Sequence, residues 1–179
     1  MTDNPTVGQR VRIMRHTDLE RVLAWRNHPD IRRYMYTQHE IGLPEHHDWF
    51  DSAAQDPCQH LLIFELRGTA LGFIKFSQLA GSSIADWGFY IAPDAPQGSG
   101  RQLGNSACEY AFQQLDLHKI CGQALELNER SINFHRRMGF QQEGFLRDQH
   151  FDGEHYHSII CFGLLRSEWQ PNLGKLHHE

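Results

Sequence analysis

Two glycines with one residue between them, Gly98 and Gly100, follow an apolar run and precede a helix-like run within residues 84–112. Glycine adopts backbone angles closed to other residues and lets a ligand approach the main chain without a Cβ in the way. The first turn of a helix leaves N–H groups without partners and carries the positive end of the helix dipole. The order strand, glycine turn and helix is therefore typical of a phosphate site held by backbone. An ordinary strand-to-helix turn would show the same pattern.

The spacing of this turn excludes two common nucleotide-binding motifs. No Gly-Lys-Ser/Thr follows, as a Walker loop requires, and Gly98-Ser99-Gly100 continues as Arg101-Gln102-Leu103 instead of completing GxGxxG. The formal net charge of the chain is −5, so it lacks the basic field that is usual in proteins that bind nucleic acid. Any phosphate ligand must be held locally, and no nucleic-acid partner is expected.

Strand and helix patterns alternate around the glycine turn in a chain of 179 residues, a length suited to one globular domain. Strands are expected at residues 7–15, 60–66, 70–79, from Ile84, at 119–127, 140–147 and 155–165. Helices are expected from Thr17 to a break before Pro29, briefly after that break, at 43–54, after the glycine turn, and at 129–138. This order predicts an α/β (α+β) fold with a mixed, mostly antiparallel sheet. We expect one domain over residues 7–166, between a disordered start at 1–6 and a polar tail at 167–179.

The cysteines and histidines do not form a metal pattern. Cys58, Cys108, Cys121 and Cys161 are widely separated without a CxxC pair, which is typical of reduced thiols and not of disulfides or zinc ligands. The 13 histidines include no HExxH-like pair, so no metal is expected. The N-terminus lacks a signal-type apolar core, and no apolar run reaches membrane-spanning length. We therefore expect a cytoplasmic protein without a membrane partner.

Two motifs and the order of the elements resemble the GCN5-related N-acetyltransferase (GNAT) superfamily, from Val11 to Leu165. The first motif is the loop QGSGRQ at 97–102, similar to Gln/Arg-x-x-Gly-x-Gly/Ala, although Gln102 stands where a small residue is usual. The second is NERSINFHRRMGF at 128–140, similar to Asn-x-x-Ala/Ser with a downstream aromatic and a Gly-Phe ending. The resemblance implies a GNAT fold with about seven strands, helices on both faces of the sheet, and a splay between the fourth and fifth strands.

The same resemblance implies acetyl-coenzyme A (acetyl-CoA) as co-substrate. Its pyrophosphate would lie on the glycine loop, and its pantetheine arm would pair with backbone exposed by the splay. The coenzyme-binding residues implied are Phe89, Tyr90, Ile91, Gln97, Gly98, Ser99, Gly100, Arg101, Gln102, Asn128, Ser131 and His135.

The N-terminal segment is similar to the PseH-type amino-sugar N-acetyltransferases of pseudaminic acid biosynthesis, in Arg26-Asn27-His28-Pro29, in Met35-Tyr36-Thr37 and in Ile41 with His46 and Trp49. This implies an acceptor that is a UDP-linked 4-amino-4,6-dideoxy-N-acetyl sugar, acetylated on its 4-amino group for flagellin glycosylation. Arg26 and His28 offer donors for a diphosphate, at a corner expected to be exposed, while Met35 and Tyr36 offer an apolar wall. The substrate-binding residues implied are Arg26, Asn27, His28, Met35, Tyr36 and His46. For Arg26 and His46, a solvated position on a helix is the alternative.

The chemistry of acetyl transfer needs a base, an oxyanion donor and an acid, because only an unprotonated amine attacks a thioester. Asp86 and Glu126 are the candidate bases, with Glu126 slightly favoured, and either is open to a plain ion-pairing role. The backbone N–H of Tyr90 is the expected oxyanion donor. His135 stands where the superfamily usually has a tyrosine acid, and an imidazolium can protonate a thiolate. Alternatively His135 only bonds the coenzyme, and the thiolate leaves unaided.

Other acceptors and another class of protein stay open from the sequence. Acetylation of a protein N-terminus, as in ribosomal-protein acetyltransferases of similar layout, and acetylation of a polyamine use the same chemistry. A coenzyme A-binding module without catalysis would account for the atypical Gln102 and His135. The chain does not specify its oligomeric state, and a homodimer is left open.

Overall fold

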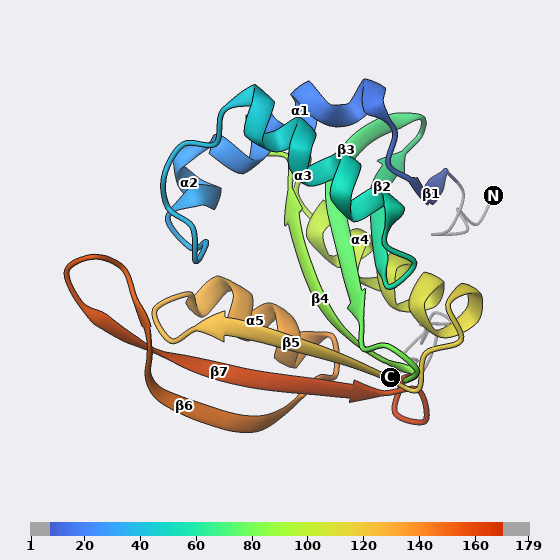
Figure 1. The fold of residues 1–179 in the computed structure, drawn as a ribbon. Coiled ribbons are helices and arrows are strands. Elements are labelled where there is room, and N and C mark those ends of the chain that lie inside the picture. The colour runs from blue at the N-terminus through green and yellow to red at the C-terminus, as the bar shows by residue number, and fades with distance from the viewer. Residues whose placement is uncertain (1–7, 170–179) are drawn as a thin grey trace.

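A seven-stranded sheet runs through the computed structural model, which describes residues 8–169 (Figure 1). The strand order is β1-β2-β3-β4-β5-β7-β6. The strands are β1 (Gln9–Ile13), β2 (Gln59–Leu66), β3 (Thr69–Gln78), β4 (Ile84–Ile91), β5 (Lys119–Leu125), β6 (Gln141–Phe151) and β7 (Tyr156–Leu165). Every neighbouring pair is antiparallel except β4 and β5. The predicted mixed, mostly antiparallel sheet is confirmed.

Helices cover both faces of this sheet, as predicted. They are η1 (His16–Asp18), α1 (Leu19–Asn27), α2 (Pro29–Arg32), α3 (Leu43–Gln55), α4 (Ser99–Glu109), a π-helical turn η2 (Tyr110–Gln114) and α5 (Glu129–Arg137). α1 and α3 pack on one face, and α4 and α5 pack on the other. In the part of the chain that the structure describes, no helix is long and apolar enough to cross a bilayer.

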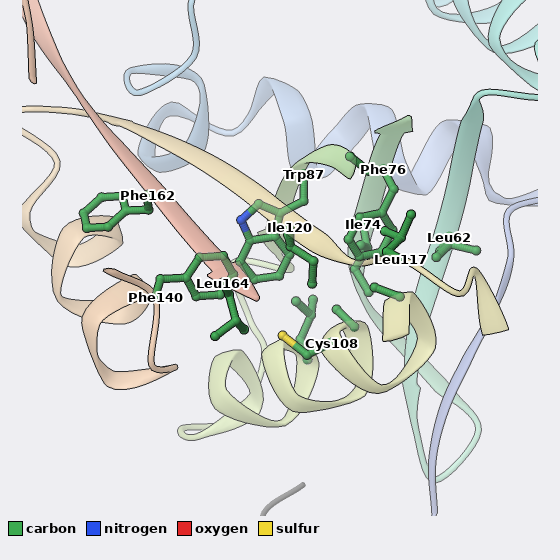
Figure 2. Close-up of a cluster of buried hydrophobic side chains, with 14 of the residues drawn as sticks. Leu62, Ile74, Phe76, Trp87, Cys108, Leu117, Ile120, Phe140, Phe162 and Leu164 are labelled. Carbon is green, nitrogen blue, oxygen red and sulfur yellow. The ribbon is translucent and has the colours of Figure 1, made fainter. Parts of the chain in front are cut away.

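The two faces of the sheet bury two separate groups of apolar side chains. The larger group lies between the sheet and α4 and α5, and includes Phe76, Trp87, Ile120 and Phe162 (Figure 2). The smaller group lies under α1 and α3, and includes Trp25. Full burial of one such side chain contributes roughly 1.5–3 kcal/mol to folding. The sheet is therefore a rigid platform on both sides of β4.

The start of α1 is fixed by a buried carboxylate. Asp18 is 2% exposed and accepts hydrogen bonds of 2.7 and 2.8 Å from Arg12 and of 2.9 Å from the backbone N–H of Arg15. Burial opposes ionisation, but these bonds outweigh it and hold the pKa of Asp18 below its usual value. Arg12 also bonds Glu65 of β2 at 2.6 Å, so α1 is tied to the sheet.

The predicted splay between β4 and β5 is confirmed. The two strands pair only from Ile84 to Asp86 on β4 and from Lys119 to Cys121 on β5, although both continue beyond these residues. In Figure 1 they begin close together and diverge along their length. A gap with unpaired backbone edges results.

The ends of the domain stay predictions, because residues 1–7 and 170–179 lie outside the described residues. The expected disordered start at 1–6 and most of the expected tail fall there. Trp169, which the sequence assigns to the tail, packs against Phe112 with ring centroids 5.4 Å apart. The packed part of the chain thus extends past residue 166.

Candidate active site

The glycine turn forms the start of α4 and is open on its outer side. Gly98 caps the helix with φ 89°, a left-handed conformation, and a Cβ at Gly98 or Gly100 would meet nothing within 4 Å. The N–H of Ser99 donates to the Pro96 carbonyl, whereas those of Gly98 and Gly100 have no backbone acceptor within residues 8–169. Ser99 is 2% exposed, and its Oγ has no partner among the described residues. Free donors in an open turn at a helix N-terminus fit a pyrophosphate.

The other residues of this loop are placed at its surface. Gln97 and Arg101 are exposed, and Gln102 is half-buried. The backbone N–H of Gln102 donates to the Gly98 carbonyl at 3.3 Å, so this residue continues the helix in spite of its size. The unusual residue at this position does not distort the turn.

The backbone of β4 faces the gap at alternate residues. Ala92 N donates to the Leu71 carbonyl of the β3 side at 2.8 Å, and strand alternation directs the N–H of Tyr90 toward the same side. The oxyanion donor predicted at Tyr90 therefore points away from the gap. The N–H and C=O groups of Phe89 and Ile91 point toward β5, where pairing has ended. These two residues, and not Tyr90, therefore present their backbone groups to the gap.

Asp86 stands where the gap begins. It pairs in register with Cys121, and both side chains lie on the face of the sheet opposite Trp87. We call this side of β4 and β5, with Asp86, Cys121 and Gln123, the open face. Asp86 is exposed, and its side chain makes no hydrogen bond or ion pair with another described residue. Its carboxylate is free to take a proton from an amine.

Glu126, the base favoured from the sequence, is held elsewhere. It lies just past the end of β5, and its Oε1 accepts a hydrogen bond of 3.1 Å from the backbone N–H of Ser158. The Ser158 hydroxyl in turn accepts from the N–H of Asp148, in a bulge of β6 where Asp148 has φ 48°. Glu126 therefore supports the β6–β7 hairpin, and the geometry favours Asp86 as the base.

The acid role predicted for His135 does not fit its position. His135 is 2% exposed, and its ring stacks on Phe162 with centroids 4.8 Å apart. Nε2 lies 3.1 Å from Trp87 Nε1, and Nδ1 lies 2.8 Å from the Ser131 carbonyl. Burial lowers the pKa of His135, against a smaller opposite effect of the Ser131 bond. A buried, neutral imidazole with both nitrogens in use cannot protonate a thiolate or bind the coenzyme.

The motif at the start of α5 builds the helix. Asn128 is the N-cap, and its Oδ1 accepts a hydrogen bond of 3.1 Å from the N–H of Ser131. Ser131 supplies the carbonyl that His135 bonds. The capping bond leaves the Asn128 amide nitrogen for a ligand, so a coenzyme contact there remains a proposal.

Arg26 is buried at 8% exposure, and not at the exposed corner that the sequence predicts. One guanidinium nitrogen donates to the Thr37 carbonyl at 2.5 Å, and Nη1 has no partner among the described residues. Burial lowers the pKa of Arg26, although a guanidinium stays charged. Burial also raises the pKa of the Tyr90 hydroxyl above its usual range, and the charge of Arg26 opposes this rise, which places the two residues near each other.

Both polar groups of the Asn27 side chain form hydrogen bonds to the backbone. Its amide donates to the Ile41 carbonyl at 2.8 Å and accepts from the Ile41 N–H at 2.9 Å. Residues 33–42, between α2 and α3, are therefore held by both Arg26 and Asn27; we call them the 33–42 loop. Asn27 positions this loop, which replaces the substrate-binding role predicted for it.

The two predicted histidines differ in environment. His28 caps α2, its Nδ1 accepting from the Asp30 N–H at 3.3 Å, as the break before Pro29 predicts. His46 is 4% exposed and stacks on Trp49 with centroids 5.0 Å apart. Its Nε2 has no partner within the described chain, and burial first, then the charges of His47 and Arg26 among lesser effects, lower its pKa.

The 33–42 loop crosses to the open face through Tyr36. Its hydroxyl donates to Gln123 Oε1 at 2.9 Å, and its ring lies 5.0 Å from that of His150 on β6. Met35, beside it, is half-buried. In Figure 1 the segment after α2 lies on the side toward which β4 and β5 diverge. Tyr36, Gln123 and Asp86 thus surround the opening of the gap.

Comparison with known proteins decides the family. The acetyltransferase (GNAT) domain family matches residues 10–141. The chain belongs to the GNAT acetyltransferase family. It is therefore an N-acetyltransferase that uses acetyl-CoA, and the open turn before α4 and the unpaired edge of β4 fit that co-substrate.

Several known proteins are similar in sequence to this GNAT enzyme, and their names differ in the acceptor that they give. The acetyltransferase PseH of Campylobacter jejuni is 26% identical over 123 residues, covering 69% of this chain and 76% of that protein. The spermidine N(1)-acetyltransferase of Escherichia coli is 25% identical over 163 residues, covering 89% and 87%. A crystal structure of spermidine N-acetyltransferase from Vibrio cholerae with CoA and spermine superposes with a TM-score of 0.83 at 21% identity, covering 91% and 98%. The last likeness concerns the fold.

Two residues of the GNAT site were not found from the sequence. Gln123 and His150 sit within strands, and neither belongs to a motif. The contact of each with Tyr36 depends on how β5 and β6 lie relative to a loop more than 80 residues earlier in the chain. Within residues 8–169, no three His, Cys, Asp or Glu side chains gather in a way that suits a metal ion.

Proposed function

We propose that this enzyme acetylates the 4-amino group of a UDP-linked 4-amino-4,6-dideoxy-N-acetyl sugar, as in pseudaminic acid biosynthesis for flagellin glycosylation. The observation that carries the proposal is the buried guanidinium of Arg26, which forms no ion pair with a carboxylate in the described part of the chain and keeps Nη1 without a partner. An unpaired buried cation is costly, and an anionic group of a substrate would balance it.

Two of the carboxylates around this region have an arginine partner, and a third has a histidine partner. Asp30 lies 3.5 Å from Arg33, Glu40 lies 3.5 Å from Arg32, and Glu45 lies 3.1 Å from His39. The charge of Glu45 also acts on Arg26, but the two form no ion pair. Arg26 is therefore a buried cation without a carboxylate in direct contact among the described residues, which favours a diphosphate-linked acceptor over a polycation.

Two further features support a sugar nucleotide. His46 Nε2 is a second buried polar atom without a partner near Arg26, and it can bond a phosphate or sugar oxygen. Met35 and Tyr36 offer apolar and aromatic surface on the 33–42 loop, which suits a sugar or a uracil ring. The PseH relative of Campylobacter jejuni is consistent with this acceptor.

The catalytic steps follow from the placement of the side chains. Acetyl-CoA supplies an activated acetyl thioester. Asp86 takes a proton from the incoming ammonium, directly or through a water, and the free amine nitrogen bonds to the thioester carbon as the C–S bond breaks. The backbone N–H of Phe89 or Ile91 faces the gap and bonds the carbonyl oxygen. The sulfur leaves as a thiolate that takes its proton from water or from the amide nitrogen, so the net products are the acetamide, coenzyme A and one proton.

A polyamine is the second candidate acceptor. The spermidine N(1)-acetyltransferase of Escherichia coli matches more of this chain than the PseH relative does, 89% against 69%. If the acceptor is a polyamine, its ammonium groups would replace Arg32 as the partner of Glu40 and His39 as the partner of Glu45. We also propose that the enzyme works in the cytoplasm, in keeping with its four free cysteines.

Incubation with acetyl-CoA and a panel of UDP-amino sugars, peptides and spermidine, followed by mass spectrometry, tests the acceptor. We expect one added acetyl group on the UDP-4-amino sugar. Acetylation of spermidine alone would replace the proposal with the second candidate.

Variants of α1 test the role of Arg26. Arg26→Ala and the milder Arg26→Lys should raise the KM for the sugar nucleotide by about tenfold or more, the cost of one charge-assisted hydrogen bond, with a smaller effect on the KM for acetyl-CoA. Arg21→Ala is the control, because Arg21 is exposed on the same helix. Equal changes in both constants would count against the assignment.

A further inference from the structure

Tyr36 makes a contact that the packing of the core does not require. Its side chain is 50% exposed, yet its hydroxyl reaches Gln123 on β5, 87 residues later in the chain. The contact joins the 33–42 loop to the C-terminal strands at the place where β4 and β5 separate. A single polar bridge over the opening of an active-site gap has a position suited to contact with substrate.

The loop that carries Tyr36 is fixed at several points. Arg26 bonds the Thr37 carbonyl, Asn27 bonds both backbone groups of Ile41, and Arg32 pairs with Glu40 at 3.5 Å. The ring of Tyr36 is supported from the other side by His150. The hydroxyl is therefore preorganised, and its position does not depend on the bond to Gln123 alone.

Gln123 lies two residues beyond Cys121, the last residue of β5 that pairs with β4. By strand alternation its side chain shares the open face with Cys121 and Asp86. Gly122, between Cys121 and Gln123, faces the opposite side of the sheet, where a Cβ would lie 2.6 Å from His135 Nε2. Gln123 is therefore on the side from which an acceptor can approach, and not on the side of the buried histidine.

The groups that meet there suit an amine. Gln123 Oε1 has a second lone pair beyond the one that accepts from Tyr36, and the Tyr36 oxygen can itself accept a hydrogen bond. Both are uncharged acceptors, and Asp86 on the same face of the sheet supplies a negative charge that pairs with no other described side chain. An ammonium group can donate to both oxygens and lose a proton to the carboxylate.

We propose that Gln123 Oε1 and the Tyr36 hydroxyl bind the acceptor amine at the opening of the β4–β5 gap, which makes both of them substrate-contacting residues of the transfer. The proposal rests on the acetyl-transfer activity and not on which amine is the natural acceptor. It also gives the 33–42 loop a function, which is to hold one of the two amine ligands in place.

Steady-state kinetics with the UDP-4-amino sugar and with spermidine test the proposal. Tyr36→Phe keeps the ring on His150 and removes the hydroxyl, and Gln123→Met keeps the length and removes the acceptor. Each should raise the KM for the amine by about tenfold, as expected for the loss of one hydrogen bond to a charged group. The Kd for acetyl-CoA, measured by calorimetry, should stay unchanged. Gln123→Glu keeps an acceptor oxygen at this position, so its KM for the amine should stay near the wild-type value, unlike that of Gln123→Met.

Matched controls separate this role from a structural one. Tyr156→Phe makes the same change at an exposed tyrosine that packs on Phe151, and Gln55→Met makes the same change at the exposed end of α3. If Tyr36→Phe and Gln123→Met change the amine KM no more than these controls, the proposal is wrong. It is equally wrong if Gln123→Glu behaves like Gln123→Met. If spermidine alone is acetylated, the sugar-nucleotide proposal fails, and the amine site is still tested with spermidine.

Discussion

Trp87 Nε1 donates a hydrogen bond to His135 Nε2 at 3.1 Å inside the core of the enzyme. An indole N–H can only donate, so Nε2 must be the acceptor and the imidazole proton must lie on Nδ1, 2.8 Å from the Ser131 carbonyl. This pair fixes the neutral form of the ring and links β4 to α5.

The pH dependence of stability should report this buried histidine. An unfolded histidine has a pKa near 6.5, and burial lowers the pKa of His135 in the folded state. Between these two values the unfolded chain binds more protons, so stability is full above about pH 6.5 and falls as the pH drops below it. We expect Tm to decrease from pH 7.5 to pH 5.5, and His135→Gln to reduce this decrease, measured by calorimetry.

His155→Gln serves as the control, because His155 is exposed. His46 is also buried with a lowered pKa, so part of the pH dependence should remain in His135→Gln. The pH profile of kcat should be unchanged in His135→Gln. If one limb of that profile is lost, His135 is the catalytic acid after all.

Replacement of the two candidate bases should give opposite results. Asp86→Asn removes a free carboxylate on the open face and should lower kcat/KM roughly 100-fold. Glu126→Gln keeps an oxygen that accepts from Ser158 N and should leave kcat/KM near the wild-type value. A larger loss in Glu126→Gln than in Asp86→Asn would reverse the assignment.

Substitutions in the glycine turn should affect stability or coenzyme binding without loss of the fold. Gly98→Ala forces a left-handed residue with φ 89° and should cost about 1 kcal/mol in stability. Gly100→Asp places a carboxylate at the predicted pyrophosphate site and should weaken acetyl-CoA binding more than about tenfold, because like charges repel there.

Thermal unfolding measures the loss of stability in Gly98→Ala, and titration calorimetry with acetyl-CoA measures the loss of affinity in Gly100→Asp. Gly153→Ala is the control, since Gly153 also has a positive φ and open space, in the β6–β7 turn. Unchanged affinity in Gly100→Asp would place the pyrophosphate elsewhere.

Local patterns in the sequence were enough for the elements and the sheet. The break before Pro29, the turn at Gly98 and the end of α5 at Gly139, with φ 91°, depend on residues next to each other. The α/β class with a mostly antiparallel sheet followed from the order of the elements, whereas the GNAT fold and the splay followed from the family resemblance. All of these are confirmed.

The environments of individual site residues could not be read from the sequence. His135 occupies a position typical of an acid, but Gly122 of β5 leaves room for the ring to turn into the core. Arg26 reads as a polar helix residue, and its burial follows from the cover that the 33–42 loop provides. Which edge of β4 carries the N–H of Tyr90 depends on the register with β3. Each of these depends on contacts between distant parts of the chain.

Only three residue pairs join β4 to β5, so the sheet consists of a four-stranded part and a three-stranded part that share a short seam. A pantetheine arm lying along Phe89 and Ile91 would lengthen that seam with its own amides. The co-substrate would then hold the four-stranded and three-stranded parts of the sheet together. Coenzyme affinity and the resistance of the two parts to separation would then depend on the same few peptide groups.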